Sequence, residues 1–292
     1  MKHNYSSSLR RTLSAVVLLI VSTLSYASYG FEVDGIYYCL QYDYNTPWGG
    51  NRYTYAEVIS NQHGKYSGDI VIPSTVDYEG KTYNVMSIGW GAFERCTSLT
   101  SVSIPESVTS IGGRAFSGCI SLTLVDIPQG CEIQQEAFKY CTSLTSISIP
   151  GGVTGIGDNA FQGCTSVTTI DLPSSIRHIS FEAFVGCVSV TTFICRAEKA
   201  PTSGSGFGWE SPEEATLYVP ASAIGDYKGS DIWPIHFRSI LPLEEYETGI
   251  DTPAALQPDE AAAAPYYTLG GQRVNAPVRG HIYIRSGRKV IY

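Results

Sequence analysis

Apolar positions recur along the middle of the chain with a period of 22 or 23 residues. The marker of this period is the phrase Ala-Phe-x-x-Cys-x-Ser-Leu/Val, whose Phe falls at Phe93, Phe116, Phe138, Phe161 and Phe184. Self-similarity at one short period is typical of a solenoid, because a single repeat cannot bury its own apolar side chains and must stack on its neighbours. The pattern therefore predicts stacked coils that share one continuous core.

Each repeat predicts one strand and two turns. The apolar residues Leu99, Val102 and Ile104 have the L-x-x-L-x-L spacing of a leucine-rich repeat strand. Pro105 ends that strand, because proline has no N–H for the ladder. The Val-x-x-Ile-Gly segment at 108–112 follows, and its glycine favours a sharp turn. The Ala-Phe-x-x-Cys segment is expected to form a short helical turn on the outer side of the coil.

The five ordered copies resemble the BspA-like leucine-rich repeat family of bacterial cell-surface proteins, over the stretch from Ile72 to about Leu243. The resemblance implies a leucine-rich repeat solenoid that is mainly β, with short helical turns on its convex side. It also implies a role in adhesion to host proteins or other cells. Because one scaffold serves many binders, the resemblance names no ligand.

Composition divides the chain into six segments. They are a signal peptide at 1–27, an aromatic-rich β cap at 28–71, the repeats at 72–194, a C-terminal cap at 195–243, a linker at 244–265 and a short β segment at 266–292. A solenoid needs caps because its end coils would otherwise expose the core.

The caps carry their own strand and packing signals. The segments 31–38 and 52–58 predict paired strands, and Glu79-Gly80 predicts a hairpin-like turn. Strand 217–220 is expected to be the last of the solenoid. Aromatic side chains of the C-terminal cap are then expected to seal the end of the core, namely Tyr227, Trp233 and Phe237.

The N-terminus indicates export. A basic start is followed by a short apolar run and by Ser25-Tyr26-Ala27, which has the small-x-small form of a cleavage site. Loss of residues 1–27 would move the formal net charge from −8 to about −11. An acidic surface disfavours nucleic acid and anionic membranes as partners. No later run is long and apolar enough to predict a transmembrane span.

The C-terminal 27 residues alternate apolar and polar positions between glycines and predict three short strands. They resemble the C-terminal sorting segment of Bacteroidota type IX secretion cargo, which implies contact with export machinery. The alternative is a plain β appendage that ends the fold. The matching residues are Leu269, Gly271, Arg273, Val274, Gly280, Ile282, Tyr283, Ile284, Gly287 and Lys289.

The eight cysteines predict buried free thiols. Five of them form one column of the repeat, and adjacent coils stack at about 4.8 Å. Side chains of one column point the same way, which is poor disulfide geometry. Changing Cys141 to Ser is expected to cost about 1–3 kcal/mol, because a buried hydroxyl would have no assured partner.

The sequence offers no catalytic, metal or cofactor constellation. The histidines are scattered, and neither His-x-x-x-His nor Cys-x-x-Cys spacing occurs. Asp126 and Asp171 occupy equivalent strand positions about 10 Å apart, a separation that a pair of glycosidase carboxylates can have. Solvated acids on an open sheet are the more ordinary interpretation. We therefore expect a protein that is not an enzyme.

The concave strand face is the predicted binding surface. One Thr heads each repeat strand, and the hydroxyl column either hydrogen-bonds an extracellular protein or glycan or simply suits an exposed strand. The predicted contact residues are Thr100, Ser101, Ser103, Thr123, Asp126, Thr145, Ser146, Ser148, Thr168, Thr169, Asp171, Thr191 and Thr192.

Aromatic side chains in loops offer an alternative site, at Trp48, Phe207 and Trp209. Three functions remain open at this point. The first is an adhesin-like protein that recognises host or microbial protein through the strand face. The second is a glycan-binding module that uses the loop aromatics, and the third is a self-associating structural component of a cell surface.

Overall fold

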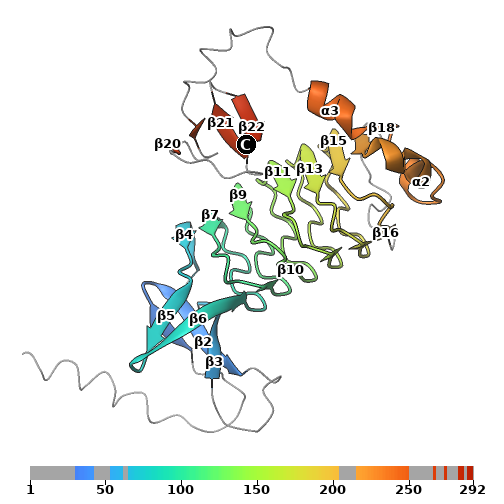
Figure 1. Ribbon diagram of the computed structural model, residues 1–292. Helices are drawn as coiled ribbons and strands as arrows, with labels where there is room; N and C mark the ends of the chain where they lie inside the picture. Colours follow the sequence, from blue (N-terminus) through green and yellow to red (C-terminus); the bar gives the residue numbers. More distant parts are fainter. Residues whose placement is uncertain are drawn as a thin grey trace, which may run out of the picture.

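The chain forms a mainly β solenoid with a strand-rich cap at one end and short helices at the other (Figure 1). The computed structural model describes residues 30–42, 53–61, 65–203 and 215–249, together with four short strands between 266 and 291. The predicted signal peptide at 1–27 lies outside the described residues. A single core cluster runs through the solenoid and its caps, from Ile36 to Ile240.

Two sheets build the coils, where the sequence predicted one. The first sheet has ten strands, and its coil strands pair in parallel. Five of these strands have only two residues. The strands are β1 (Phe31–Val33), β2 (Ile36–Tyr42), β3 (Tyr53–Val58), β5 (Thr75–Tyr78), β6 (Lys81–Ile88), β8 (Ser110–Ile111), β10 (Glu132–Ile133), β12 (Gly155–Ile156), β14 (His178–Ile179) and β16 (Thr202–Ser203).

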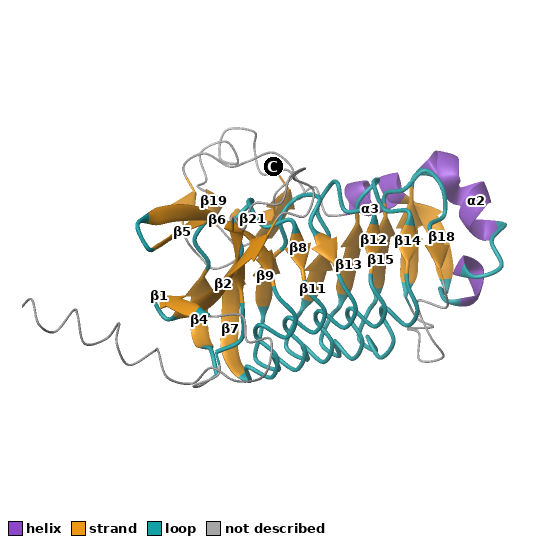
Figure 2. Ribbon diagram, turned by 90° about the horizontal axis from the view of Figure 1, so that it is seen from below, coloured by secondary structure: helices purple, strands orange, loops and turns teal. Residues whose placement is uncertain are grey.

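The second sheet contains the predicted leucine-rich repeat strands, side by side in Figure 2. It is divided into a piece of three strands and a piece of five, and no pairing joins β9 to β11 among the described strands. The strands are β4 (Ser67–Val71), β7 (Ser98–Ser103) and β9 (Leu124–Asp126), then β11 (Ser146–Ser148), β13 (Thr169–Leu172), β15 (Thr192–Cys195), β17 (Thr216–Val219) and β18 (Ser239–Pro242).

The glycine of the Val-x-x-Ile-Gly segment serves close packing and not a special turn. Gly112 does not have positive φ. A Cβ on it would lie 2.8 Å from the carbonyl oxygen of Ile88 in the preceding coil. Only a residue without a side chain lets the two backbones approach so closely. The expected sharp turn at Gly112 is therefore replaced by a short strand that continues into the next turn.

The Ala-Phe-x-x-Cys segments form hydrogen-bonded turns, for example from the Cys96 N–H to the Phe93 carbonyl at 3.0 Å. A left-handed residue precedes both the Ala and the Cys of each phrase, which stops the turn from extending into a helix. The left-handed residues are Gly91, Arg114, Glu136, Asn159 and Glu182 before Ala, and Arg95, Gly118, Tyr140, Gly163 and Gly186 before Cys.

The phenylalanines of these turns form a continuous stack inside the solenoid. From Phe93 to Phe184, neighbouring ring centroids are 5.0–5.7 Å apart and the ring planes lie within 8° of parallel. Stacked pairs of this kind contribute about 0.5–1.5 kcal/mol beyond the burial of their area. The Phe93 N–H also donates to the Ala115 carbonyl at 2.7 Å, so the turns join successive coils as the strands do.

All eight cysteines are buried, as predicted. In the repeat column, each thiol from Cys119 to Cys187 donates to the carbonyl of the Phe one coil earlier, at 3.0–3.3 Å. Burial raises the pKa of the Cys119 thiol to about 12 and that of Cys141 well above its ordinary value. The Phe116 carbonyl is thus an acceptor that a hydroxyl at position 141 could also use, a partner that the sequence did not reveal.

The N-terminal cap confirms the predicted strands and adds a hairpin. The segment read as one strand at 31–38 is a β1–β2 hairpin around Asp34 and Gly35, both with positive φ. The predicted turn at Glu79 and Gly80 joins β5 to β6 and has the same left-handed geometry. Two consecutive left-handed residues are what a two-residue hairpin requires.

The C-terminal cap continues the solenoid further than predicted. β18 pairs in parallel with β17, so strand 217–220 is not the last. Tyr227, Trp233 and Phe237 are buried against the end of the core, as expected. The short helical segments of this cap are the 3₁₀ turns Ala221–Ala223 and Trp233–Ile235 and the helix α2 (Ile224–Lys228).

One predicted boundary and one predicted strand count also change. Helix α3 (Leu243–Gly249) occupies the start of the predicted linker. The C-terminal segment contains four antiparallel strands where three were predicted. They are β19 (Tyr266–Tyr267), β20 (Arg273–Val274), β21 (Ile282–Arg285) and β22 (Arg288–Ile291).

Candidate functional site

The predicted contact residues lie on the outward side of β7, β9, β11, β13 and β15 and the turns that precede them, here called the strand face. None of them is buried. Register places Ser146, Thr169 and Thr192 in one column and Ser148 and Asp171 in the next. The inward residues between them enter the core, which is the alternation that a half-exposed strand requires.

The threonine column is part of the backbone ladder. The Thr123, Thr168 and Thr191 hydroxyls each donate to the carbonyl of the Thr one coil earlier, at 3.1–3.4 Å. These donors are therefore already used within the protein, and what they offer a partner is their acceptor lone pairs. The structure thus gives the column a stabilising role that exists without any ligand.

Asp69 on β4 belongs to this surface, although the sequence did not single it out. Its Oδ1 accepts hydrogen bonds from the Ser101 hydroxyl at 2.5 Å and the Thr100 hydroxyl at 2.7 Å. These two bonds hold the pKa of the Asp69 carboxyl below its ordinary value. The sequence could have placed Asp69 here only through the register that pairs β4 with β7. The first coil does not follow the repeat pattern, so that register could not be read from the sequence.

Helix α3 covers the other end of the strand face. Arg196 forms a two-point ion pair with Asp171, at 3.0 Å for both bonds, and a third bond of 3.0 Å to Glu247 of α3. The hydrogen bond that Arg196 donates to Asp171 is the main cause that raises the pKa of Arg196. The Tyr218 and Tyr246 rings also meet, with centroids 5.0 Å apart.

This arrangement changes the interpretation of Asp171 as a free outward acid, because its carboxylate is held by Arg196. Ile194, which the strand register places opposite Asp171 in the same column, is buried. The open part of the strand face therefore lies toward the N-terminal coils. Asp126, two coils before Asp171, is exposed.

The alternative contact residues Trp48, Phe207 and Trp209 lie outside the described residues. Within the described ranges, no three His, Cys, Asp or Glu side chains gather as a metal site would require. No helix in the part of the chain that the structure describes is long and apolar enough to cross a membrane.

Comparison with known proteins agrees with this architecture. Residues 80–198 match the model of the BspA type leucine rich repeat region, in six copies. No curated protein sequence matches the chain.

Solved structures of three bacterial proteins are similar. A leucine-rich repeat protein of T. pallidum is 26% identical with a TM-score of 0.51, over 68% of this chain and 89% of that protein. One from Bacteroides ovatus is 26% identical with a TM-score of 0.45, over 66% of this chain and only 60% of that protein. A leucine rich cell surface protein of Faecalibacterium prausnitzii is 20% identical with a TM-score of 0.43, over 75% of this chain and 74% of that protein.

Proposed function

Residues 80–198 are a leucine-rich repeat region of the BspA type, and from that premise we propose that the chain is an exported, non-enzymatic binding protein of the bacterial cell surface. It recognises a host or microbial protein through the strand face. One observation carries the proposal: outward hydroxyl side chains run across several coils that share one rigid core.

Binding is spread over several coils, because each coil presents only two or three outward side chains. Hydroxyl groups outnumber charged groups on this surface, which favours a partner that hydrogen-bonds to hydroxyl and carbonyl oxygens over one recognised by charge. The ladder bonds of Thr123, Thr168 and Thr191 keep these oxygens in fixed positions. A surface fixed before binding loses less conformational entropy when the partner docks.

The test begins with the full chain probed against an array of extracellular-matrix proteins and glycans. Changing Thr145 and Thr168 together to Lys places two charges on the strand face. Both positions are exposed, so the Thr145 change should alter the free energy of unfolding by no more than about 0.5 kcal/mol. The Thr168 change also removes its hydroxyl bond to the Thr145 carbonyl and should cost about 0.5–1.5 kcal/mol, which leaves the protein folded. Binding to the protein found on the array should fall at least tenfold, equivalent to about 1.4 kcal/mol.

A matched control adds the same two charges elsewhere. Thr97 and Thr165 are also exposed, but they lie in the turns that follow the Cys column. Changing both to Lys should leave binding intact. Equal loss in the two double variants would show a general charge effect, and persistence of binding in the strand-face variant would reject this surface. Loss of binding on changing Trp48 or Trp209 to Ala would then favour the glycan-binding alternative at the loop aromatics.

We also propose that residues 266–292 direct export or surface retention through contact with the export machinery. The sequence resemblance of this segment to type IX sorting segments supports the proposal. Removal of residues after Pro265 should leave the melting temperature of the solenoid nearly unchanged, while the amount of protein at the cell surface changes. Unchanged surface display would reject the sorting role and leave a plain β appendage.

A further inference from the structure

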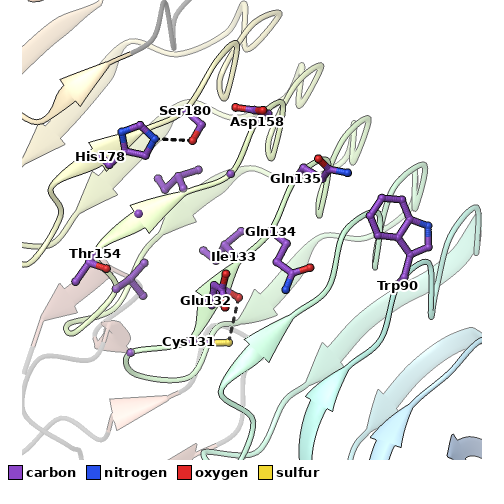
Figure 3. Close-up of a pocket in the computed structure, with 15 residues that line it drawn as sticks. Trp90, Cys131, Glu132, Ile133, Gln134, Gln135, Thr154, Asp158, His178 and Ser180 are labelled. Carbon is purple, nitrogen blue, oxygen red and sulfur yellow. Dashed lines mark hydrogen bonds between the residues drawn. The ribbon is translucent and has the colours of Figure 1, made fainter. Parts of the chain in front are cut away.

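A groove of about 630 Å³ crosses the outer side of the first sheet at β10, β12 and β14. Its volume lies within the range of about 300–1,000 Å³ that is usual for small-molecule sites. Figure 3 shows Trp90 at one end and His178 with Ser180 at the other, with Glu132 and Gln134 between them. This sheet is distinct from the strand face.

The groove exists because one coil lacks a side chain in an outward column. The residue before the buried Ile is Ser110 in β8, Glu132 in β10 and His178 in β14, but it is Gly155 in β12. Neither conformation nor packing requires this glycine. Its φ is not positive, and an added Cβ would meet only the His178 carbonyl oxygen, at 3.9 Å.

Gly157, two residues later, provides the contrast. A Cβ there would lie 2.5 Å from the carbonyl carbon of Gln134, so close backbone packing explains that glycine. A glycine inside a strand weakens the strand, and it often marks a place where a ligand approaches. Gly155 is thus a feature for which the fold itself supplies no reason.

Polar side chains along the groove are held in position. The Gln134 amide donates to the Ser110 hydroxyl at 3.3 Å and accepts from the Gly113 N–H at 3.1 Å. The two ring nitrogens of His178 lie 2.8 Å from the Ser180 hydroxyl and 3.2 Å from the Thr202 hydroxyl. Groups positioned in this way lose little freedom when a ligand binds.

Two carboxylates give the groove its charge. Glu132 is exposed, and its carboxylate has no partner among the described residues. Asp158 accepts one hydrogen bond from the Phe181 N–H at 3.0 Å, through Oδ1, which leaves Oδ2 as a second acceptor. Carboxylate oxygens accept hydrogen bonds from hydroxyl groups and repel anions. The ligand is therefore a hydrogen-bond donor without negative charge.

Trp90 supplies an aromatic surface at the end of the groove. It is 57% exposed, yet its ring is held in place because it packs directly on the backbone of Gly113. The contact is so close that a Cβ added to Gly113 would lie 2.3 Å from the ring. The Arg114 guanidinium lies 5.8 Å from the ring centroid. A fixed, exposed indole combines apolar contact area with a low entropy cost of binding.

We propose that this groove binds a neutral oligosaccharide, whose hydroxyl groups donate to Glu132 and Asp158 and whose C–H face packs on Trp90. The path from the β6 coil to β14 crosses four strand spacings, about 19 Å in total, so the ligand has several sugar units and runs across the strands. The proposal stands independently of protein binding at the strand face.

The test is calorimetric titration of the full chain with neutral trisaccharides, namely cellotriose, maltotriose and triacetylchitotriose. We expect at least one to bind. Gly155→Thr should reduce its affinity at least tenfold by filling the groove, while the melting temperature stays unchanged or rises, because Thr suits a strand and a Cβ has room there. Trp90→Ala should reduce the affinity to a similar extent.

Tyr140→Ala is the matched control. Tyr140 is 51% exposed and packs on Gly163 as Trp90 packs on Gly113, but it does not line the groove. This variant should keep full affinity, and so should the double Lys variant of the strand face.

Three results would overturn the proposal. They are no binding by any of the trisaccharides, binding that survives Gly155→Thr, and binding of tetralysine to the groove in place of the sugars. Tetralysine binding would be recognised by its loss at high salt and in Glu132→Gln, because exposed charges are screened. Saccharide binding should change little with salt.

Discussion

Replacement of Cys141 provides a sensitive test of how the coils are joined. Its thiol is buried and donates to the Phe116 carbonyl at 3.1 Å, and the same carbonyl accepts the Cys119 N–H at 3.1 Å. Alanine removes the donor and leaves a small cavity, while the carbonyl keeps its backbone bond. Serine keeps a donor in nearly the same place. The two variants therefore separate the hydrogen bond from the packing.

The magnitudes follow from these contacts. The alanine variant loses a sulfur atom of roughly methylene size, whose burial is worth about 0.8 kcal/mol. The cavity and the lost hydrogen bond from the thiol to the Phe116 carbonyl bring the loss of stability to about 1–2 kcal/mol. Serine buries a hydroxyl at a cost of about 1–3 kcal/mol, of which a hydrogen bond to the Phe116 carbonyl recovers about 0.5–1.5 kcal/mol. We expect serine to cost about 1 kcal/mol, no more than alanine.

Equilibrium urea unfolding, followed by circular dichroism, measures these differences. The same pair of substitutions at Cys164, whose thiol lies 3.3 Å from the Phe138 carbonyl, serves as an internal repeat. A serine variant that is less stable than the alanine variant by 1 kcal/mol or more, at both positions, would refute the hydrogen-bond argument. Thiol counting by mass spectrometry, with and without denaturant, checks in parallel that the cysteines are free, and three or more disulfides would refute that expectation.

Two further predictions concern the column and the ring stack. Burial raises the pKa of Cys119 from 9.0 to about 12. Between about pH 9 and 12 the thiol therefore loses its proton in the unfolded chain but keeps it in the folded protein. The free energy of unfolding should fall by about 1.4 kcal/mol per pH unit for this thiol over that range. Unfolding measured against pH should give a shallower decline for Cys119→Ala, and an unchanged slope would contradict this. In double-mutant cycles of Phe→Leu changes, the adjacent pair Phe116 and Phe138 should show a coupling of about 0.5–1.5 kcal/mol. The separated pair Phe116 and Phe161 should show a coupling near zero, and equal couplings would rule out nearest-neighbour stacking.

The period of the sequence was enough to predict the solenoid and its core, because the Phe and Cys columns repeat without interruption. The coil strands of the first sheet were missed because strands such as Ser110–Ile111 have two residues, too few to show alternation. The β1–β2 hairpin had a readable signal, since Asp34-Gly35 is a favoured hairpin dipeptide between apolar residues. Its residues were instead read as one strand.

The surface was harder to predict than the core. The strand-face residues were placed correctly as outward, but the ion pair of Asp171 with Arg196 was not foreseen. The further bond of Arg196 to Glu247 depends on helix α3, most of which lies in the segment taken for linker. The groove depends on register, because Gly155 becomes unusual only when it is compared with its neighbours across the sheet. Periodicity specifies what is the same in every coil, whereas a site arises where one coil differs.

The break between β9 and β11 has a mechanical consequence. The first sheet runs unbroken past this point, and the outer turns also stay joined, for example by the hydrogen bond from the Phe116 N–H to the Ala137 carbonyl. On the strand-face side, no strand pairing ties the two coils among the described strands. Val125 and Ile127 beside the break are only partly buried. A bending load should therefore open the rod at this seam, with the continuous sheet as the hinge. The molecule would behave as two stiff segments joined by a compliant joint, and a partner that spans the joint would lock its angle.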